Sequence, residues 1–222
     1  MGDPTVLINN AGVARGRNLL AATERDVRFT FDVNALAHYW TVREFVPAMV
    51  RADHGMVVTV ASFAAWIAVA DMVDYAASKA AAQALHEGLA TELATRHGAP
   101  RVRTVLVNQG FTKTRLFTGY RADAAPFLAP ALEPESVAEA IVRQVLSGRS
   151  GQIVLPLAGH ALSALAAMPH WYQVRERNKN QTLMTHFSGR QVVEDLDRFY
   201  EGKEKGGEGT AEGSTVLVSE PT

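Results

Sequence analysis

A tyrosine and a lysine four residues apart, Tyr75 and Lys79, are the residues in this chain best suited to chemistry. On a helix this spacing places both side chains on one face, one turn apart. A free phenol titrates near pH ~10, and an adjacent ammonium stabilises the phenolate and lowers that pKa. Ser62, at the end of an apolar run, supplies a hydroxyl that can hold a substrate oxygen against the phenol. Together they predict a proton-transfer site for an alcohol or a carbonyl.

The Tyr-x-x-x-Lys spacing also occurs where a half-buried ring and a solvated cation simply share a helix, so the surrounding residues decide its meaning. Asn9-Asn10-Ala11-Gly12, Asn34 and Ser62 precede the pair in that order. This series resembles the short-chain dehydrogenase/reductase family. The resemblance extends over residues 5–156, and it is strongest to the branch of retinol dehydrogenases, 17-beta-hydroxysteroid dehydrogenases and their fungal relatives.

Composition narrows the other possibilities. The 222 residues are 47% apolar, enough for one domain with a real core. The 22 basic and 23 acidic residues nearly cancel, which argues against nucleic acid as a partner. There is no cysteine, no His-x-x-x-His pair and no Gly-x-Ser-x-Gly motif, so neither a metal site nor a hydrolase nucleophile is predicted. Without a signal segment or an apolar run of membrane-spanning length, a cytoplasmic protein is expected.

The elements that must position the site alternate along the chain. Four short apolar runs predict buried strands at residues 5–8, 55–62, 102–108 and 152–155. Three segments with helical periodicity lie between them, at residues 24–51, 74–96 and 134–148. We expect Asp71 or Asp74 to cap the second of these helices. Alternating strands and helices predict an α/β fold, a Rossmann-like doubly wound parallel sheet with right-handed crossovers.

Three parts are expected along the chain. Residues 1–156 form the C-terminal portion of a Rossmann-fold domain, residues 157–200 a helical extension, and residues 201–222 a disordered tail rich in Gly, Glu, Lys and Ser. In the extension, an apolar stretch at 161–168 precedes a basic run at 175–179. We expect it to cover the substrate pocket. The alternative is peripheral contact with a membrane or a lipid droplet.

The resemblance implies a role for each catalytic residue. Tyr75 is expected to be the general acid/base, and Lys79 to lower its pKa and bind the nicotinamide ribose. Ser62 would orient the substrate oxygen, and Asn34 would hold a water that links Lys79 to solvent. Taken by itself, Asn34 can equally be interpreted as a satisfied polar residue inside a helix.

The resemblance also implies an NAD(P) cofactor, with NADP favoured over NAD. The residues expected to contact it, besides Tyr75 and Lys79, are Asn10, Ala11, Gly12, Gly110, Thr112 and Thr114. Two departures stand out. Gln109 occupies a position where the family usually has proline, and the glycine-rich turn after the family's first strand is missing. The four predicted strands of this chain resemble strands four to seven of the family's sheet. We therefore expect a truncated form that binds cofactor poorly.

Substrate and partners follow from the same comparison. Nine apolar residues fall in the loops that surround the substrate in the family: Phe63, Trp66, Ile67, Met72, Phe111, Leu116, Phe117, Tyr120 and Phe127. They predict a hydrophobic alcohol, ketone or aldehyde, although half of them could instead be ordinary core. The alanine-rich helix around residues 76–84 predicts a homodimer. The rival hypothesis is a non-catalytic remnant that acts as a dimerisation or membrane-associated scaffold.

Overall fold

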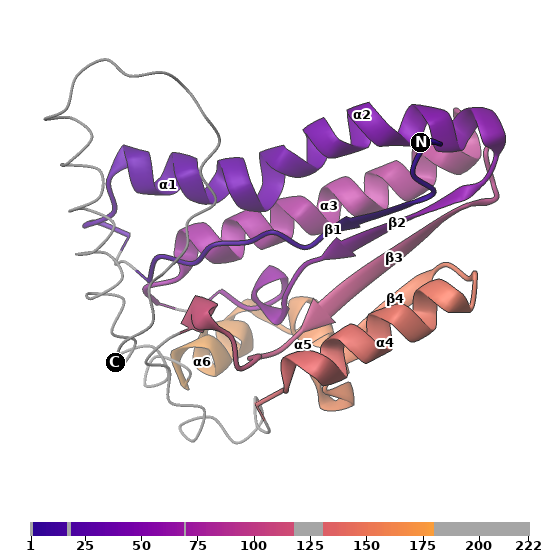
Figure 1. The fold of residues 1–222 in the computed structure, drawn as a ribbon. Helices are drawn as coiled ribbons and strands as arrows, with labels where there is room; N and C mark the ends of the chain where they lie inside the picture. The colour runs from indigo at the N-terminus through magenta and orange to yellow at the C-terminus, as the bar shows by residue number, and fades with distance from the viewer. Residues whose placement is uncertain (1, 17–18, 69, 118–130, 180–222) are drawn as a thin grey trace, which may run out of the picture. The chain divides into compact units, whose positions relative to one another are not determined.

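The computed structural model describes residues 2–16, 19–68, 70–117 and 131–179, all within one compact unit, Met1–Gly189. Within these residues four strands form one parallel sheet in the order β1-β2-β3-β4 (Figure 1). The strands are β1 (Val6–Asn9), β2 (Gly55–Val60), β3 (Val102–Gln109) and β4 (Gly151–Leu155). The predicted parallel α/β sheet is therefore confirmed, with each boundary within two residues of its expected position.

The first strand differs from its prediction in one respect. β1 pairs with β2 and forms one edge of the described sheet, so the expected burial on both faces is wrong for part of it. Val6 is 41% exposed and Ile8 47% exposed, whereas Leu7 packs against the cluster beneath α2. Side chains alternate between the faces of a strand, so one face of β1 is covered and the other is open.

The first helical segment is not one continuous helix. It consists of α1 (Glu24–Phe31), a π-helical turn (Asp32–Leu36) and α2 (Ala37–Ala52). A capping box between Thr23 and Asp26 begins it. The π turn contains Asn34, whose side chain accepts a hydrogen bond from the backbone of Val13 in the loop after β1. Interruptions of this kind are frequent at functional sites.

The expected caps of the next helix, α3 (Val73–Thr95), are wrong. Its N-cap is Met72, which makes no side-chain capping bond. Asp71 has a positive φ of 61°, and Asp74 lies inside the first turn. There Asp74 accepts a hydrogen bond from Thr30 Oγ1 at 2.8 Å, so this carboxylate joins α1 to α3 instead of capping its own helix.

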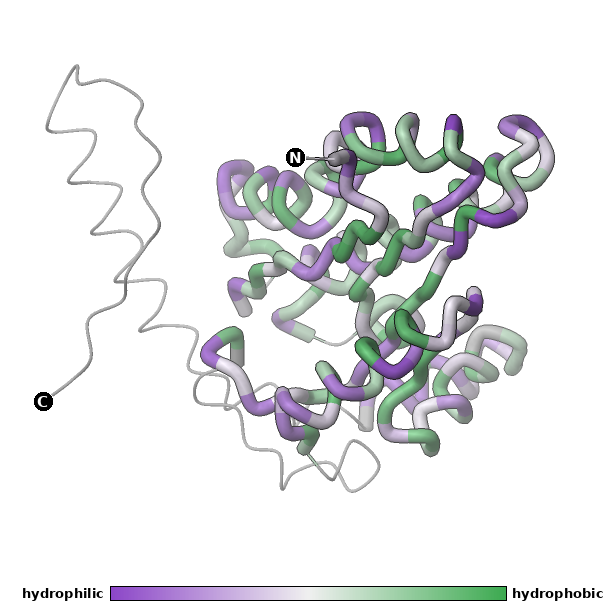
Figure 2. Tube along the Cα trace, turned by 45° about the vertical axis from the view of Figure 1, so that its right-hand side comes forward, coloured by the Kyte–Doolittle hydropathy of each residue, from purple (hydrophilic) through white to green (hydrophobic). Residues whose placement is uncertain are grey.

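The core has two layers, one on each face of the sheet. On one face, α2 and α3 pack Val46, Met49 and Leu93 against Val57. On the other, α4 (Pro134–Leu146) packs Val137 and Ile141 against Met56, Val58, Val60, Val105 and Val107. The sheet is therefore doubly wound, and Figure 2 shows hydrophobic residues gathered along the strands between the helices.

The position of α4 also corrects the expected handedness. Strand order advances in one direction from β1 to β4, yet α4 lies on the opposite face from α2 and α3 (Figure 1). The crossover through α4 must therefore have the opposite hand to the two crossovers before it. The expectation that all of them are right-handed is wrong for this part of the sheet.

After β4 the chain continues in short helices. A 3-10 turn (Leu157–Gly159) leads into α5 (His160–Ser163), a second 3-10 turn (Ala164–Ala167) and α6 (His170–Lys179). A Cβ placed on Gly159 would overlap the ring of Phe63, so the extension lies tightly against the loop that follows Ser62. Across the described residues, none of the helices has the length and apolarity needed to cross a membrane. The predicted tail, 201–222, lies outside the described residues.

Candidate active site

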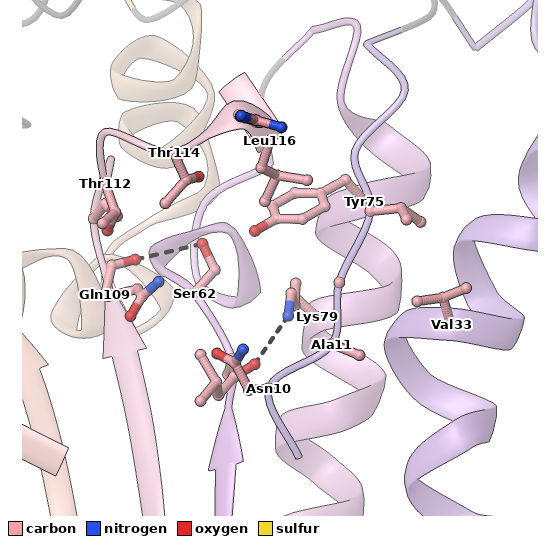
Figure 3. Close-up of a pocket in the computed structure, with 16 residues that line it drawn as sticks. Asn10, Ala11, Val33, Ser62, Tyr75, Lys79, Gln109, Thr112, Thr114 and Leu116 are labelled. Carbon is pink, nitrogen blue, oxygen red and sulfur yellow. Dashed lines mark hydrogen bonds between the residues drawn. The ribbon is translucent and has the colours of Figure 1, made fainter. Parts of the chain in front are cut away.

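The carboxyl ends of the first three strands open into a cavity of about 600 Å³ (Figure 3). Loops after β1, β2 and β3 line it together with the first turns of α3. The structure brings together nine of the ten predicted site residues around it: Asn10, Ala11, Gly12, Ser62, Tyr75, Lys79, Gly110, Thr112 and Thr114. Ligands of open parallel sheets bind at this end of the strands.

Tyr75 points its hydroxyl into the same space as the hydroxyl of Ser62 (Figure 3). Burial of the phenol raises its pKa to about 12, and a hydrogen bond with the Ser62 side chain opposes that rise without cancelling it. The lysine ammonium lies 5.9 Å from the centroid of the Tyr75 ring and donates a hydrogen bond to Val60. The expected lowering of the Tyr75 pKa by Lys79 stays a prediction.

Lys79 donates that bond to the backbone carbonyl of Val60, at 2.9 Å. Its side chain is 3% exposed, and burial lowers its pKa to about 8. The group can therefore gain or lose a proton close to neutral pH. A Cβ on Gly12 would lie 3.4 Å from the lysine Nζ, so the loop after β1 passes within contact distance of the ammonium.

Asn34 is the predicted catalytic residue that does not line the cavity. Its side chain is fully buried and makes two hydrogen bonds with the backbone of Val13. Asn34 Oδ1 accepts from the Val13 amide nitrogen, and Asn34 Nδ2 donates to the Val13 carbonyl, each at 2.8 Å. Nδ2 also donates to Ser78 Oγ at 3.0 Å. Asn34 therefore fixes the loop after β1 onto α3, and its predicted role as a water ligand stays a prediction.

The residues that hold Ser62 were not identified from the sequence. Asn108, which is completely buried in β3, donates to the backbone carbonyl of Ser62 at 3.2 Å and to Gln83 Oε1 on α3 at 3.0 Å. Its own Oδ1 accepts from Gln152 Nε2 on β4 at 2.8 Å. The available signal was an asparagine directly after the apolar run 105–107 of β3, which must find partners if it is buried.

Gln109 places an amide where proline was expected. Its backbone carbonyl accepts a long bond, 3.5 Å, from Ser62 Oγ, and its side chain lines the cavity. Among the described residues, its buried Oε1 has no partner.

The nine apolar loop residues do not all face the cavity. Leu116 lines it, whereas Phe63, Ile67 and Met72 are between 2% and 6% exposed and belong to the core. Trp66 stacks on Phe63 with ring centroids 5.6 Å apart. Tyr120, Phe127 and the side chain of Phe117 lie outside the described residues.

Two buried histidines lie beneath the site, His38 on α2 and His86 on α3. Burial lowers the pKa of each to about 4, and the nearby charge of Lys79 contributes to the shift at His38. Both imidazoles are therefore neutral in the folded protein at pH values where the imidazoles of an unfolded chain are already charged.

This difference predicts acid destabilisation. As pH falls from about 6.5 to about 4, the unfolded state binds more protons, so the free energy of unfolding decreases by on the order of 3 kcal/mol per histidine. Urea unfolding measured at several pH values in this window will show the decrease. The slope is expected to be shallower in His38→Leu, and His97→Gln, which removes an exposed imidazole, is the matched control. An unchanged slope in His38→Leu would contradict the assignment.

Known proteins resemble this chain in sequence and in fold. The sequence model of the short chain dehydrogenase family matches residues 1–125. Dehydrogenase RED2 of Cochliobolus heterostrophus is 51% identical over 104 residues, 47% of this chain and 39% of the relative. Estradiol 17-beta-dehydrogenase 11 of Rattus norvegicus is 40% identical over 149 residues, 67% of this chain and 48% of the relative.

A solved structure agrees with these matches. The short chain dehydrogenase from Burkholderia cenocepacia J2315, in complex with NADP, has a TM-score of 0.60 and 31% identity, covering 77% of this chain and 68% of that one. The chain spans about half the length of the curated relatives it matches. With the family model covering more than half of its residues, the chain belongs to the short-chain dehydrogenase/reductase family.

Proposed function

We propose that the protein is an NAD(P)-dependent oxidoreductase that interconverts a hydrophobic alcohol and its ketone or aldehyde. The observation that carries the proposal is the convergence of Ser62, Tyr75 and Lys79 on one cavity at the carboxyl ends of the strands. A serine hydroxyl and a protonated phenol are both placed to bind one substrate oxygen, and a buried ammonium lies beside them.

The residues present fit a nicotinamide dinucleotide, which when bound supplies or accepts the hydride. Asn10, Ala11 and Gly12 would hold its adenine-side ribose, and Lys79, which lies next to Gly12, the nicotinamide ribose. Gly110, Thr112 and Thr114 would hold the nicotinamide end, beside the unpartnered Gln109 acceptor in the described part of the chain. We favour NADP over NAD, in line with the NADP complex of the Burkholderia relative.

In this proposal the protein's own residues handle the proton. In reduction, Tyr75 gives its proton to the substrate oxygen while the Ser62 hydroxyl donates a hydrogen bond to the same atom. The high pKa of Tyr75 keeps it protonated at neutral pH, which is the form reduction needs. In oxidation Tyr75 takes the proton, and the positive charge of Lys79 stabilises the phenolate that accepts it. Asn34 keeps the loop over Lys79 in place.

Few charges line the cavity. Val13, Val33, Val60 and Leu116 form apolar walls, and Arg115 is the charged lining residue besides Lys79 in the described part of the chain. A hydrophobic substrate such as a steroid, a retinoid or a long-chain aldehyde suits such walls. The name of the Rattus relative, an estradiol dehydrogenase, points to the same class.

The test is a turnover assay. NADPH and NADH oxidation should be followed with a hydrophobic ketone and a long-chain aldehyde, both for these 222 residues and for a version extended by in-frame upstream coding sequence. We expect the 222 residues to bind cofactor weakly, because none of the four strands in the described residues is followed by a glycine-rich turn. Turnover in the extended version supports the proposal, whereas no turnover in either version favours the scaffold alternative.

We also propose a homodimer formed through α2 and α3. The exposed face of α2 carries Tyr39 and Trp40, which are 51% and 60% exposed, and Leu36, at the end of the π turn before it, is 39% exposed. The adjacent exposed positions of α3 are small, Ala77, Ala80 and Ala84, so a second copy can approach closely.

The dimer gives a further prediction. Trp40→Glu places a charge in the centre of the interface and should raise the dimer dissociation constant by at least roughly 30-fold. Sedimentation velocity measures this directly. Val142→Glu is the matched control, since Val142 is an exposed apolar residue on α4, across the sheet. A wild-type monomer at micromolar concentration would contradict the dimer.

The helical extension is proposed to cover the substrate pocket. A second cavity, of about 420 Å³, lies between Ile67 and the short helices after β4. The alternative, peripheral contact with a membrane or lipid droplet, is supported by the exposure of Met168, Trp171 and Val174 next to the basic Arg175. Flotation with anionic vesicles separates the two roles.

A further inference from the structure

Buried and partly buried polar residues on β1, β2, α2 and α3 are joined to one another. We call Asn9, His38, Thr41, Thr59 and His86 the inner polar cluster. Four of them are between 1% and 6% exposed, and Thr41 is partly buried. None of the five lines the cavity.

Hydrogen bonds and strand register join the cluster. Thr41 Oγ1 lies 2.8 Å from Asn9 Oδ1 and 3.1 Å from the backbone carbonyl of His38, so it ties β1 to α2. Asn9 is the register partner of Thr59 on β2. Thr59 Oγ1 in turn lies 2.9 Å from His86 Nδ1 on α3.

Three buried nitrogen atoms of the cluster have no protein partner among the described residues: Asn9 Nδ2, His38 Nδ1 and His38 Nε2. Leaving buried polar atoms unpaired is costly, and folded proteins usually pair such atoms with ordered water. A neutral imidazole offers one acceptor and one donor, and the asparagine amide offers a donor. The site is therefore polar on several sides, as an internal water requires.

Lys79 reaches this region, because its ammonium bonds to the carbonyl of Val60, the residue that follows Thr59 on β2. Its ammonium carries three N–H donors, and the bond to Val60 uses one of them. Lys79 acts electrostatically on His38, as does His86, and both belong to α3. The strands contribute the uncharged Asn9 and Thr59 to the same region.

We propose that His38 is a positioning residue for Lys79, and that it acts through internal water held by its ring nitrogens and Asn9 Nδ2. That water accepts a hydrogen bond from the Lys79 ammonium and donates one to the unprotonated nitrogen of His38. The ammonium is thereby held between Val60 and the inner polar cluster. This inference deepens the proposed function and rests on it for its catalytic meaning.

The test measures the pKa of Lys79 and needs no turnover. In the full chain, the rate of Lys79 acetylation by acetic anhydride is followed against pH by peptide mass spectrometry. His38→Phe keeps a ring but removes both nitrogens, so the ammonium loses the water and its pKa should fall by about one unit. At pH 7 the acetylation rate of Lys79 should then rise roughly fivefold.

Two comparisons make the result specific. His38→Asn, which can still hold water, should leave the Lys79 pKa close to wild type. His86→Phe, a buried substitution further along the same helix as Lys79, should do the same. An unchanged Lys79 pKa in His38→Phe, or an equal fall in His86→Phe, would overturn the inference. If His38→Phe does not fold, Asn9→Ala removes the other water ligand and should lower the Lys79 pKa in the same direction.

Because the readout is chemical reactivity, it separates the two hypotheses. A shifted Lys79 pKa in a protein that turns over no substrate would leave the water site standing and remove the proposed function. Turnover of substrate, together with an unshifted Lys79 pKa in His38→Phe, would support the proposed function and remove the water site.

Discussion

Replacing Tyr75 with phenylalanine is expected to lower kcat by about a thousandfold in the form of the protein that oxidises NADPH. Removal of a positioned general acid costs between about 10² and 10⁴ in rate. The ring is 4% exposed and packs in the first turns of α3, so phenylalanine keeps the packing and removes only the hydroxyl and its bond to Ser62. Steady-state kinetics with a hydrophobic ketone provide the measurement.

Two controls make this result interpretable. Tyr39→Phe removes a phenol from an exposed position on α2 and should leave kcat unchanged. Circular dichroism and thermal unfolding should show that Tyr75→Phe remains folded. If the variant retained more than about a tenth of wild-type kcat, Tyr75 would not be the proton donor.

Replacing Asp26 with alanine is expected to lower the free energy of unfolding by about 3–5 kcal/mol. Asp26 Oδ1 accepts from Arg15 at 2.6 Å, and both side chains are at most 5% exposed. Without its carboxylate, the guanidinium stays buried and uncompensated, above the ring of Phe29 at 4.7 Å. The change also removes the capping box with Thr23 that begins α1.

A neighbouring ion pair supplies the control. Glu24 and Arg28 form an exposed pair four residues apart on the same helix, with both side chains more than 70% exposed. Glu24→Ala should therefore change the free energy of unfolding by less than about 0.5 kcal/mol. Urea unfolding of both variants measures the difference. Equal decreases in the free energy of unfolding would show that burial does not make the Arg15–Asp26 pair more important for stability than the exposed pair.

Sequence patterns predicted the strands, and they predicted that site residues lie close together, for a simple physical reason. Continuous apolar runs form buried parallel strands, and polar residues that follow such strands must meet at one edge of the sheet. Ser62 was identified from its place at the end of such a run, whereas Asn10 and Thr112 were expected from the family resemblance, and all three line the cavity. Tyr75 and Lys79 followed from helical spacing, which is local and therefore visible in the sequence.

The features that were missed depend on contacts distant in sequence. Asn34, in the π turn, is hydrogen-bonded to Val13, 21 residues away. Asp74 accepts a hydrogen bond from Thr30, 44 residues away, instead of capping its own helix. The orientation of Lys79 toward Val60 depends on how α3 packs on β2. The hand of the crossover through α4 depends on which face of the sheet α2 and α3 already cover. No local sequence pattern determines which face a helix will cover.

The bonds around Asn108 have a practical meaning for redesign. They hold the main-chain carbonyl of Ser62 and extend across β3, α3 and β4, so the backbone of the serine is fixed from the sheet, while the backbone N–H of Ala64 donates to its hydroxyl oxygen. A library that varies Trp66 and Ile67 could therefore change the loop after Ser62 while the backbone of the serine stays in place. Three amide side chains, Asn108, Gln83 and Gln152, would carry that constancy.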